Sequence, residues 1–167
     1  MGKEKKNWKK ELLWYSLMIV IAIVLSRGIH FIVGLVLNTP TPFLVVASGS
    51  MEPTLNIGDI IVIRGVRTED LKVGDIIVFN PPKPYYNGIP WVHRIISIQS
   101  IGGEKYFRTK GDANLYPDPF TLTKENIIGI VIWKIPYLGL ISLRLWQWVI
   151  PITLIISLII ILKLKIK

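Results

Sequence analysis

Ser50 is the side chain of this sequence best suited to act as a nucleophile. It lies in the run Ala47–Leu55, where Glu52 is the single charged residue, directly between Gly49 and Met51, and Pro53 follows closely. Glycine permits an unusual backbone turn and proline fixes φ, so the run predicts a hydroxyl that is held at a defined position and presented outward. The same residue types also build an ordinary surface turn. Chemistry at Ser50 therefore depends on which groups the rest of the chain brings to it.

A serine nucleophile needs a base within hydrogen-bond reach, and the base usually needs an orienting group. The sequence contains two histidines, His30 and His93, and no cysteine. His93 lies in the strand-like run Trp91–Ile96, where alternation places it on a face with apolar side chains. Asp112 and Asp118 follow the next strand-like run and fall in one loop. A buried structural histidine and turn-capping aspartates are equally ordinary roles, so residue types alone leave the function open.

The net charge of +9 is concentrated at the two ends of the chain. Residues 1–11 contain five lysines and two glutamates, and residues 163–167 contain three lysines. Residues 38–145 contain eleven basic and nine acidic side chains without a basic block, which is an ordinary solvated surface rather than a phosphate-binding groove. We therefore expect no nucleic-acid partner. The absence of cysteine excludes disulfides and thiolate metal sites, and we expect neither a cofactor nor a bound metal.

The first long apolar segment, Leu12–Leu37, is predicted to be a transmembrane helix. Its 26 residues are interrupted only by Arg27, His30 and small side chains. A helix of this length reaches about 39 Å, more than the roughly 30 Å of a hydrocarbon core, with Arg27 near one interface. A cleavable signal peptide has an apolar core of only about 7 to 15 residues, so we interpret the segment as an anchor and His30 as an interfacial structural residue.

A second apolar segment, Trp146–Leu162, is 17 residues long and contains Pro151. It is predicted to span the membrane as well, and a position in the interface is the alternative. Since lysines flank the outer ends of both segments, the positive-inside rule places both termini in the cytoplasm. The predicted order is a basic tail, a span, an extracytoplasmic domain, a second span and a basic tail, at residues 1–11, 12–37, 38–142, 143–162 and 163–167.

The domain between the two segments is predicted to be mainly β. Turn signals that contain glycine, such as Gly58-Asp59 and Gly74-Asp75, separate its apolar and β-branched runs. Several runs are apolar on both faces, which is typical of strands in a closed or sandwiched sheet. We expect a small antiparallel β-domain with strands at Phe43–Val46, Ile57–Val66, Asp75–Phe79, Trp91–Ile98, Lys105–Thr109 and Ile127–Ile135.

Four motifs occur in one order, namely Ser48–Thr54, Gly74–Phe79, Val92–Ile95 and Lys110–Asn114, the last of them followed by Asp118. This ordered set resembles the motifs of type I signal peptidases. Because His93 stands where the bacterial enzymes carry a lysine, the sequence is more similar to the archaeal and endoplasmic-reticulum type. The resemblance covers about residues 44–135 together with the preceding anchor.

This resemblance implies a Ser-His-Asp peptidase with the signal peptidase fold. In that family Ser50 corresponds to the nucleophile and His93 to the general base and later acid. Asp118 is the implied partner of the imidazole, with Asp112 as a second important carboxylate. The implied oxyanion hole consists of the Ser50 N–H and the Ser48 hydroxyl.

The same resemblance implies a membrane-bound serine endopeptidase that removes signal peptides from translocated preproteins after small, A-x-A-like residues. The substrate is expected to lie extended along Phe43, Leu44, Val45 and Val46. The implied partners are signal peptides of secretory preproteins, the lipid bilayer and the translocation machinery. The implied location is the cell membrane.

Two other functions stay open at the level of the sequence. One is a noncatalytic, membrane-anchored β-domain that binds a protein partner. The other is a peptidase of the same fold with a Ser–Lys dyad that uses Lys110, a residue that we otherwise interpret as structural. The sequence also leaves open which of Asp112 and Asp118 contacts His93.

Overall fold

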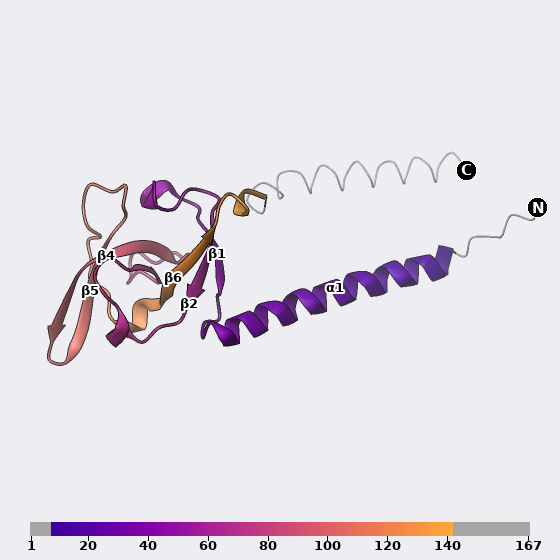
Figure 1. Ribbon diagram of the computed structural model, residues 1–167, viewed down its shortest axis with the longest axis horizontal. Coiled ribbons are helices and arrows are strands. Elements are labelled where there is room, and N and C mark those ends of the chain that lie inside the picture. Colours follow the sequence, from indigo (N-terminus) through magenta and orange to yellow (C-terminus); the bar gives the residue numbers. More distant parts are fainter. Residues whose placement is uncertain (1–7, 142–167) are drawn as a thin grey trace, which may run out of the picture.

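The structure, a computed structural model, describes residues 8–141, with side chains from residue 13 onward. Its first element is helix α1, Trp8–Val36, which covers the predicted anchor and begins before it. Within it, Leu13–Val36 is the only stretch among the described residues that is long and apolar enough to cross a membrane. Figure 1 shows α1 leading away from the β-domain. The predicted second span, 143–162, lies outside the described residues.

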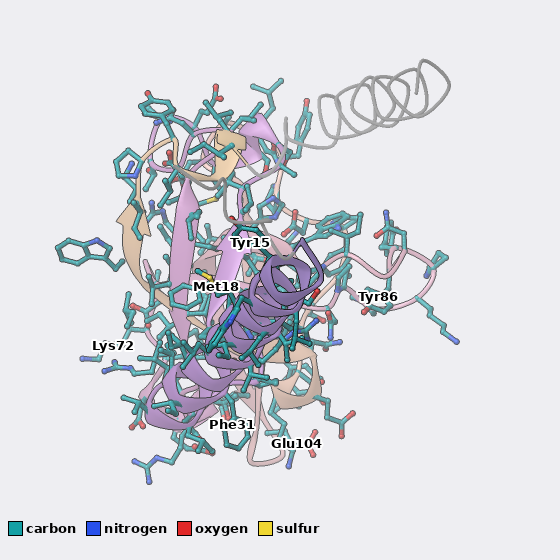
Figure 2. The ribbon with its side chains drawn as sticks, turned by 90° about the vertical axis from the view of Figure 1, so that its right-hand side faces the viewer. Tyr15, Met18, Phe31, Lys72, Tyr86 and Glu104 are labelled. Atoms are coloured by element: carbon teal, nitrogen blue, oxygen red, sulfur yellow. The ribbon has the colours of Figure 1, made fainter. Side chains whose placement is uncertain are left out.

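The surface of α1 is apolar and open. None of the Leu13–Val36 stretch is buried within the structure. Figure 2 looks nearly along the helix, and its labelled Tyr15 and Phe31 are both exposed. An apolar helix that the protein itself does not cover matches the composition expected of a membrane anchor.

Six strands form one antiparallel sheet in the order β1-β2-β6-β3-β4-β5, which confirms the predicted small antiparallel β-domain. β1 and β5 are the edges of this sheet. Each strand falls on a run that the sequence predicted. The strands are β1 Phe43–Val45, β2 Ile60–Arg64, β3 Ile76–Phe79, β4 Trp91–Ile101, β5 Glu104–Lys110 and β6 Ile127–Ile135.

Two strands, β2 and β4, differ in length from the predicted runs by three residues or more because of backbone turns. The predicted run Ile57–Val66 becomes the shorter β2, since Gly58 adopts a φ of +89° and turns the chain before the strand begins. β4 continues past the predicted end at Ile98 to form a long hairpin with β5. Gly102 and Gly103 close that hairpin with positive φ angles of 61° and 86°, which glycine tolerates.

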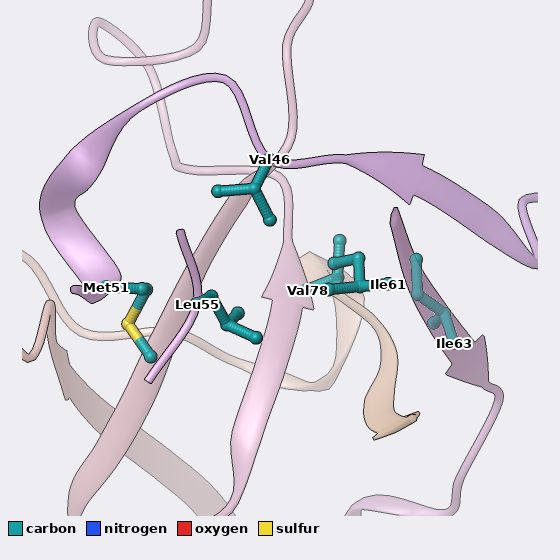
Figure 3. Close-up of a cluster of buried hydrophobic side chains, with 6 residues drawn as sticks. All are labelled: Val46, Met51, Leu55, Ile61, Ile63 and Val78. Atoms are coloured by element: carbon teal, nitrogen blue, oxygen red, sulfur yellow. The ribbon is translucent and has the colours of Figure 1, made fainter. Parts of the chain in front are cut away.

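Apolar side chains cover both faces of the sheet, as the doubly apolar runs indicated. The consecutive β3 residues Ile77 and Val78 are both fully buried, on opposite faces. The Val78 face holds the segment that carries Ser50, because three of its core residues flank that serine in sequence. Figure 3 shows this cluster, Val46, Met51, Leu55, Ile61, Ile63 and Val78. The Ile77 face holds Leu71, Ile77, Phe79, Ile95, Phe107 and Leu122.

Three single-turn 3₁₀ helices, which the sequence did not predict, connect the strands at η1 Gly49–Met51, η2 Thr68–Asp70 and η3 Lys124–Asn126. η1 carries Ser50 at its centre. The expectation that Gly49 supplies an unusual turn is wrong, because its φ is not positive and it lies in a helical turn. A Cβ at Gly49 would approach the Glu52 side chain to 3.2 Å, so the glycine supplies room rather than a special backbone angle.

Candidate active site

The loop after β5 fixes the backbone of Ser50. The Ala113 N–H donates a 2.9 Å hydrogen bond to the Ser50 carbonyl. Gly111 lies so close that an added Cβ would come within 2.5 Å of the same carbonyl oxygen. Met51, the next residue, is 1% exposed in the core. The Ser50 hydroxyl is therefore presented by a backbone that is anchored through its carbonyl and through its neighbour.

His93, on β4, places its imidazole beside Ser50, where it can act as a base. Its Nε2 lies 3.2 Å from Ser50 Oγ, and its Nδ1 lies 2.7 Å from Asp118 Oδ2. The His93 and Asp118 side chains are only 6% and 4% exposed. A carboxylate can only accept, so Nδ1 carries a proton and donates to Asp118, which leaves Nε2 free to accept the serine proton.

Asp118 is oriented in turn by β5. Thr109 Oγ1 donates a 2.6 Å hydrogen bond to the same Oδ2 atom that His93 contacts. The Asp118 N–H also donates to the Thr109 carbonyl at 2.9 Å. Both residues are buried, so this carboxylate has little freedom to rotate. The structure thus connects Ser50, His93, Asp118 and Thr109 in one chain of hydrogen bonds and identifies Asp118 as the aspartate that contacts His93.

Aromatic rings pack against the imidazole of His93. Phe79 and Trp91 make edge-type contacts with His93, with ring centroids 6.1 and 5.7 Å away. Phe120 packs on both of these rings. Such contacts restrict the orientation of the His93 ring and keep bulk water from the His93–Asp118 hydrogen bond.

Asp112 belongs to a separate network. Arg94, next to His93 on β4, donates from Nε to Asp112 Oδ1 at 2.8 Å and from Nη2 to Oδ2 at 2.6 Å. Thr54 Oγ1 donates to the same Oδ2 at 2.6 Å. The Arg94 guanidinium, assisted by Thr54 and opposed by partial burial, holds the pKa of Asp112 below its ordinary 3.8. This network fastens Thr54, which closely follows Ser50, to the strand that carries the base.

The Ser50 hydroxyl opens onto a groove of about 470 Å³. Leu44–Ser48, at the end of β1 and just beyond it, form one part of its lining, and Asn87 with Ile89–His93 form another. Most of these side chains are apolar, as is typical of a pocket for an apolar ligand segment. Of the four residues predicted to bind substrate, Phe43 does not line the groove, and its ring instead lies 6.3 Å from the ring of His30.

Comparison with known proteins identifies the family. A family model described as signal peptidase, peptidase S26, matches residues 12–105, more than half of the chain. The chain belongs to the signal peptidase family. It is 32% identical over 152 residues to the signal peptidase complex catalytic subunit SEC11C of Homo sapiens, which covers 85% of this chain and 77% of that protein. It is also 32% identical over 147 residues to the SEC11 subunit of Colletotrichum graminicola, covering 83% and 81%.

These relatives confirm a type I signal peptidase of the archaeal and endoplasmic-reticulum type, and they confirm that the chain is a peptide-bond hydrolase. A noncatalytic binding domain is therefore set aside. The matched family region ends before Asp112 and Asp118, so the placement of these two aspartates comes from the structure of this signal peptidase itself. Among the described residues, no group of three or more His, Asp and Glu could hold a metal ion.

Lys110, the residue of the alternative dyad, ends β5 in register with Arg94. In the described part of the signal peptidase, the side chains that hydrogen-bond to Ser50 Oγ are Ser48, at 3.3 Å, and His93. No hydrogen bond joins the Lys110 side chain to Ser50 there. The geometry consequently gives the dyad no support.

Three polar residues of the site were missed at the level of sequence. Thr54 and Arg94 lie inside recognised motifs but were assigned no role. Thr109 sits two residues after Phe107, on the buried face of β5. A hydroxyl at a buried strand position needs a hydrogen-bond partner, and this requirement could have identified Thr109 from the sequence.

Proposed function

We propose that this signal peptidase removes signal peptides from translocated preproteins by acyl transfer to Ser50. The observation that carries the proposal is the hydrogen-bond chain from Ser50 through His93 to Asp118 at the edge of an apolar groove. Nucleophile, base and orienting carboxylate are the three roles that serine acyl transfer requires. Ser50 Oγ lies 3.2 Å from His93 Nε2, and His93 Nδ1 lies 2.7 Å from Asp118 Oδ2.

In the proposed reaction, Ser50 Oγ attacks the scissile carbonyl while His93 Nε2 takes its proton. His93 then returns the proton to the leaving amine, and a water molecule activated by the same imidazole hydrolyses the acyl-enzyme. Asp118, held by Thr109, keeps Nδ1 protonated and stabilises the imidazolium. The 3.2 Å distance from Ser50 to His93 is at the long end for a hydrogen bond, as is common before substrate binds.

The oxyanion of the tetrahedral intermediate needs donors of its own. We propose the Ser50 N–H and the Ser48 hydroxyl for this task. Ser48 precedes η1 in an extended conformation, and its Oγ lies 3.3 Å from Ser50 Oγ. The loss of one donor of this kind typically costs about 3 kcal/mol of transition-state stabilisation. Asp112, bound to Arg94, acts in this scheme through Thr54 and makes no direct contact with His93.

The free edge of β1 offers the substrate a place to extend the sheet. The Val46 N–H donates to Asp59 O at 2.8 Å, and the Pro42 carbonyl accepts from Ile63 N–H at 2.9 Å, so the backbone of these two residues faces β2. Since main-chain groups alternate sides along a strand, the N–H and carbonyl of Val45 face away from β2. An extended peptide could pair there, with its side chains in the groove.

Cleavage after small side chains fits the walls of this groove. Val46 and Val92 line it close to Ser50 and His93. Branched apolar walls leave room for alanine beside the nucleophile and exclude bulky side chains by overlap. We therefore propose the A-x-A-like preference for this chain.

The location and partners follow from the anchor and the relatives. We propose that α1 holds the domain at the outer face of the cell membrane, with a second span at 143–162 and both termini in the cytoplasm. The proposed partners are preproteins with signal peptides, the bilayer and the translocation machinery. The named relatives are subunits of a signal peptidase complex, which supports a comparable association here.

A cleavage assay tests the proposed function. The full chain in detergent is mixed with a preprotein that carries an Ala-x-Ala site, and the new N-terminus is read by mass spectrometry. Cleavage directly after the second alanine, abolished when that alanine becomes phenylalanine, is the expected result. Cleavage that ignores the substitution, or no cleavage of any preprotein, would contradict the proposed substrate class.

A further inference from the structure

Asp59 and Lys134 form a charged pair next to the segment that carries Ser50. Asp59 is fully buried just before β2, and it accepts hydrogen bonds from the N–H of Asn56, at 3.0 Å, and of Tyr137, at 3.1 Å. Lys134 Nζ lies 3.5 Å from its Oδ2. Burial opposes ionisation, but the N–H donors of Asn56 and Tyr137, together with Lys134, hold the pKa of Asp59 below its ordinary 3.8. Asp59 is thus an anion fixed in the structure.

Lys134 links this anion to Thr54. Its Nζ donates a 2.7 Å hydrogen bond to the Thr54 carbonyl. The hydroxyl of the same threonine donates to Asp112 at 2.6 Å. Thr54 is therefore held on one side by Lys134 from β6 and on the other by the Arg94–Asp112 pair, with Arg94 on β4. Charged partners make each of these hydrogen bonds stronger than a neutral one.

Thr54 and Ser50 belong to one tight turn, so the position of the first affects that of the second. The Glu52 N–H bonds to the Gly49 carbonyl, and the Leu55 N–H bonds to the Met51 carbonyl. The Ser50 to His93 contact of 3.2 Å leaves little tolerance before the hydrogen bond is lost. In the described residues, neither Lys134 nor Asp59 forms a hydrogen bond or ion pair with Ser50, His93 or Asp118.

We propose that Lys134, supported by Asp59, is a positioning residue that holds Ser50 in register with His93 through the Thr54 carbonyl. The inference rests on the proposed role of Ser50 as the nucleophile. It predicts that loss of the Lys134 ammonium lowers the rate of the chemical step. Substrate binding is expected to persist, because Lys134 does not line the groove.

The chain provides a matched control in Lys105. Its Nζ also donates to a backbone carbonyl, that of Glu69, at 3.0 Å. Lys105 lies on β5 near the tip of the long hairpin, in register with Ser100, and is remote from the Ser50 turn. Lys134→Met and Lys105→Met therefore delete the same kind of hydrogen bond, and only the first touches the segment of the nucleophile.

The experiment measures kcat and KM for preprotein cleavage by the full chain in detergent, for wild type, Lys134→Met, Lys105→Met and Ser50→Ala. Circular dichroism and thermal melting confirm that each variant is folded at the assay temperature. We expect kcat of Lys134→Met to fall by about ten- to a hundredfold, the range caused by small misplacements of reacting groups. We expect its KM, and both constants of Lys105→Met, to stay within about twofold of wild type. If Lys134→Met does not fold, the same fall in kcat is expected of Lys134→Gln.

The outcomes separate this inference from the proposed function. Wild-type kcat in a folded Lys134 variant, next to an inactive Ser50→Ala, overturns the positioning role alone. An equal fall in kcat for Lys105→Met, or a change confined to KM, overturns it as well. Cleavage by Ser50→Ala overturns the proposed function and this inference together.

Discussion

Asp112 and Asp118 carry the same functional group in one loop, yet they have different partners. Asp118 accepts from His93 and Thr109, whereas Asp112 binds Arg94 and Thr54. The division originates on β4, where the neighbours His93 and Arg94 point to opposite faces of the strand. Two adjacent residues thereby reach two carboxylates, one in the hydrogen-bond chain of Ser50 and the other in the network that holds the Ser50 turn.

Asp118→Asn is expected to lower kcat by about a thousandfold or more, because the amide no longer enforces the Nδ1-protonated tautomer of His93. KM is expected to change little, since Asp118 does not line the groove. Steady-state kinetics of preprotein cleavage measure both constants. Asp70→Asn, at an exposed pair with Arg67, is the control. Near-normal kcat in Asp118→Asn would show that His93 is oriented by another group.

Asp112→Asn is expected to lower stability in a pH-dependent way. The pKa of Asp112 is below 3.8 in the folded protein because of Arg94, then Thr54, and it returns to its ordinary value on unfolding. A lowered pKa stabilises the fold fully above the unfolded value, and the contribution is lost as pH falls through the folded pKa. The free energies of unfolding in urea of wild type and variant should differ most at about pH 6, and the difference should shrink as the pH falls below the ordinary 3.8 of the carboxyl. A difference that stays constant over this range would be evidence against the Arg94 pairing.

At the scale of elements, β1 combines two tasks on its two edges. One edge pairs with β2, and the other is free along the groove within the described residues. Its short length limits how far a substrate can pair, since only Phe43–Val45 are in strand conformation. The site thus depends on an exposed strand edge, which most proteins protect from pairing with other chains.

Val45→Pro and Leu44→Pro distinguish these two edges. Val45→Pro removes an N–H that points away from β2, so kcat/KM is expected to fall by about tenfold, the value of one hydrogen bond, with little change in melting temperature. Leu44→Pro removes an N–H on the β2 side and is expected to lower the melting temperature. The two variants are compared by thermal melting and preprotein cleavage. Full activity in Val45→Pro would exclude pairing of the substrate with this edge at that residue.

The periodicity of the sequence was enough to predict the strands, and the order of motifs was enough to predict that Ser50 and His93 lie side by side. Where local pattern sets the element, as in the strand Ile127–Ile135, the observed first and last residues are the predicted ones. Contacts that depend on register could not be predicted, because a β-bulge between Ile95 and Ser97 shifts the pairing of β4 with β5. The choice between the two aspartates depends on that pairing. Lys134 is the single charged residue of the apolar strand β6, so the sequence indicated that it needs a partner. Its partners Thr54 and Asp59 could not be predicted, because they are distant in sequence.

At the scale of the whole molecule, the site lies on a domain tethered by α1. The helix ends at Val36 and β1 begins at Phe43. The first strand after the helix is therefore the strand that borders the groove. His30 of α1 and Phe43 of β1 are in ring contact. With α1 in the bilayer as proposed, this short connection would keep the groove near the membrane surface, where the proposed substrates are anchored.

Because the chain has no cysteine, its topology can be read from single introduced thiols. Ile101→Cys, at a position 62% exposed near the hairpin tip, is expected to react with a membrane-impermeant maleimide on intact cells. Lys3→Cys and Lys167→Cys are expected to react only after lysis. Labelling of Lys167→Cys on intact cells would mean that the C-terminus is outside and that 143–162 does not span.

The most direct test of the hydrogen-bond chain compares the rate of preprotein cleavage by wild type, Ser50→Ala, His93→Ala and Lys110→Ala in detergent. We predict that Ser50→Ala and His93→Ala each lose at least about a thousandfold in kcat, because nucleophile and base act as a unit and removing either disables the reaction. Lys110→Ala is predicted to retain wild-type activity. Retained cleavage by Ser50→Ala or His93→Ala, or loss in Lys110→Ala alone, would contradict this prediction.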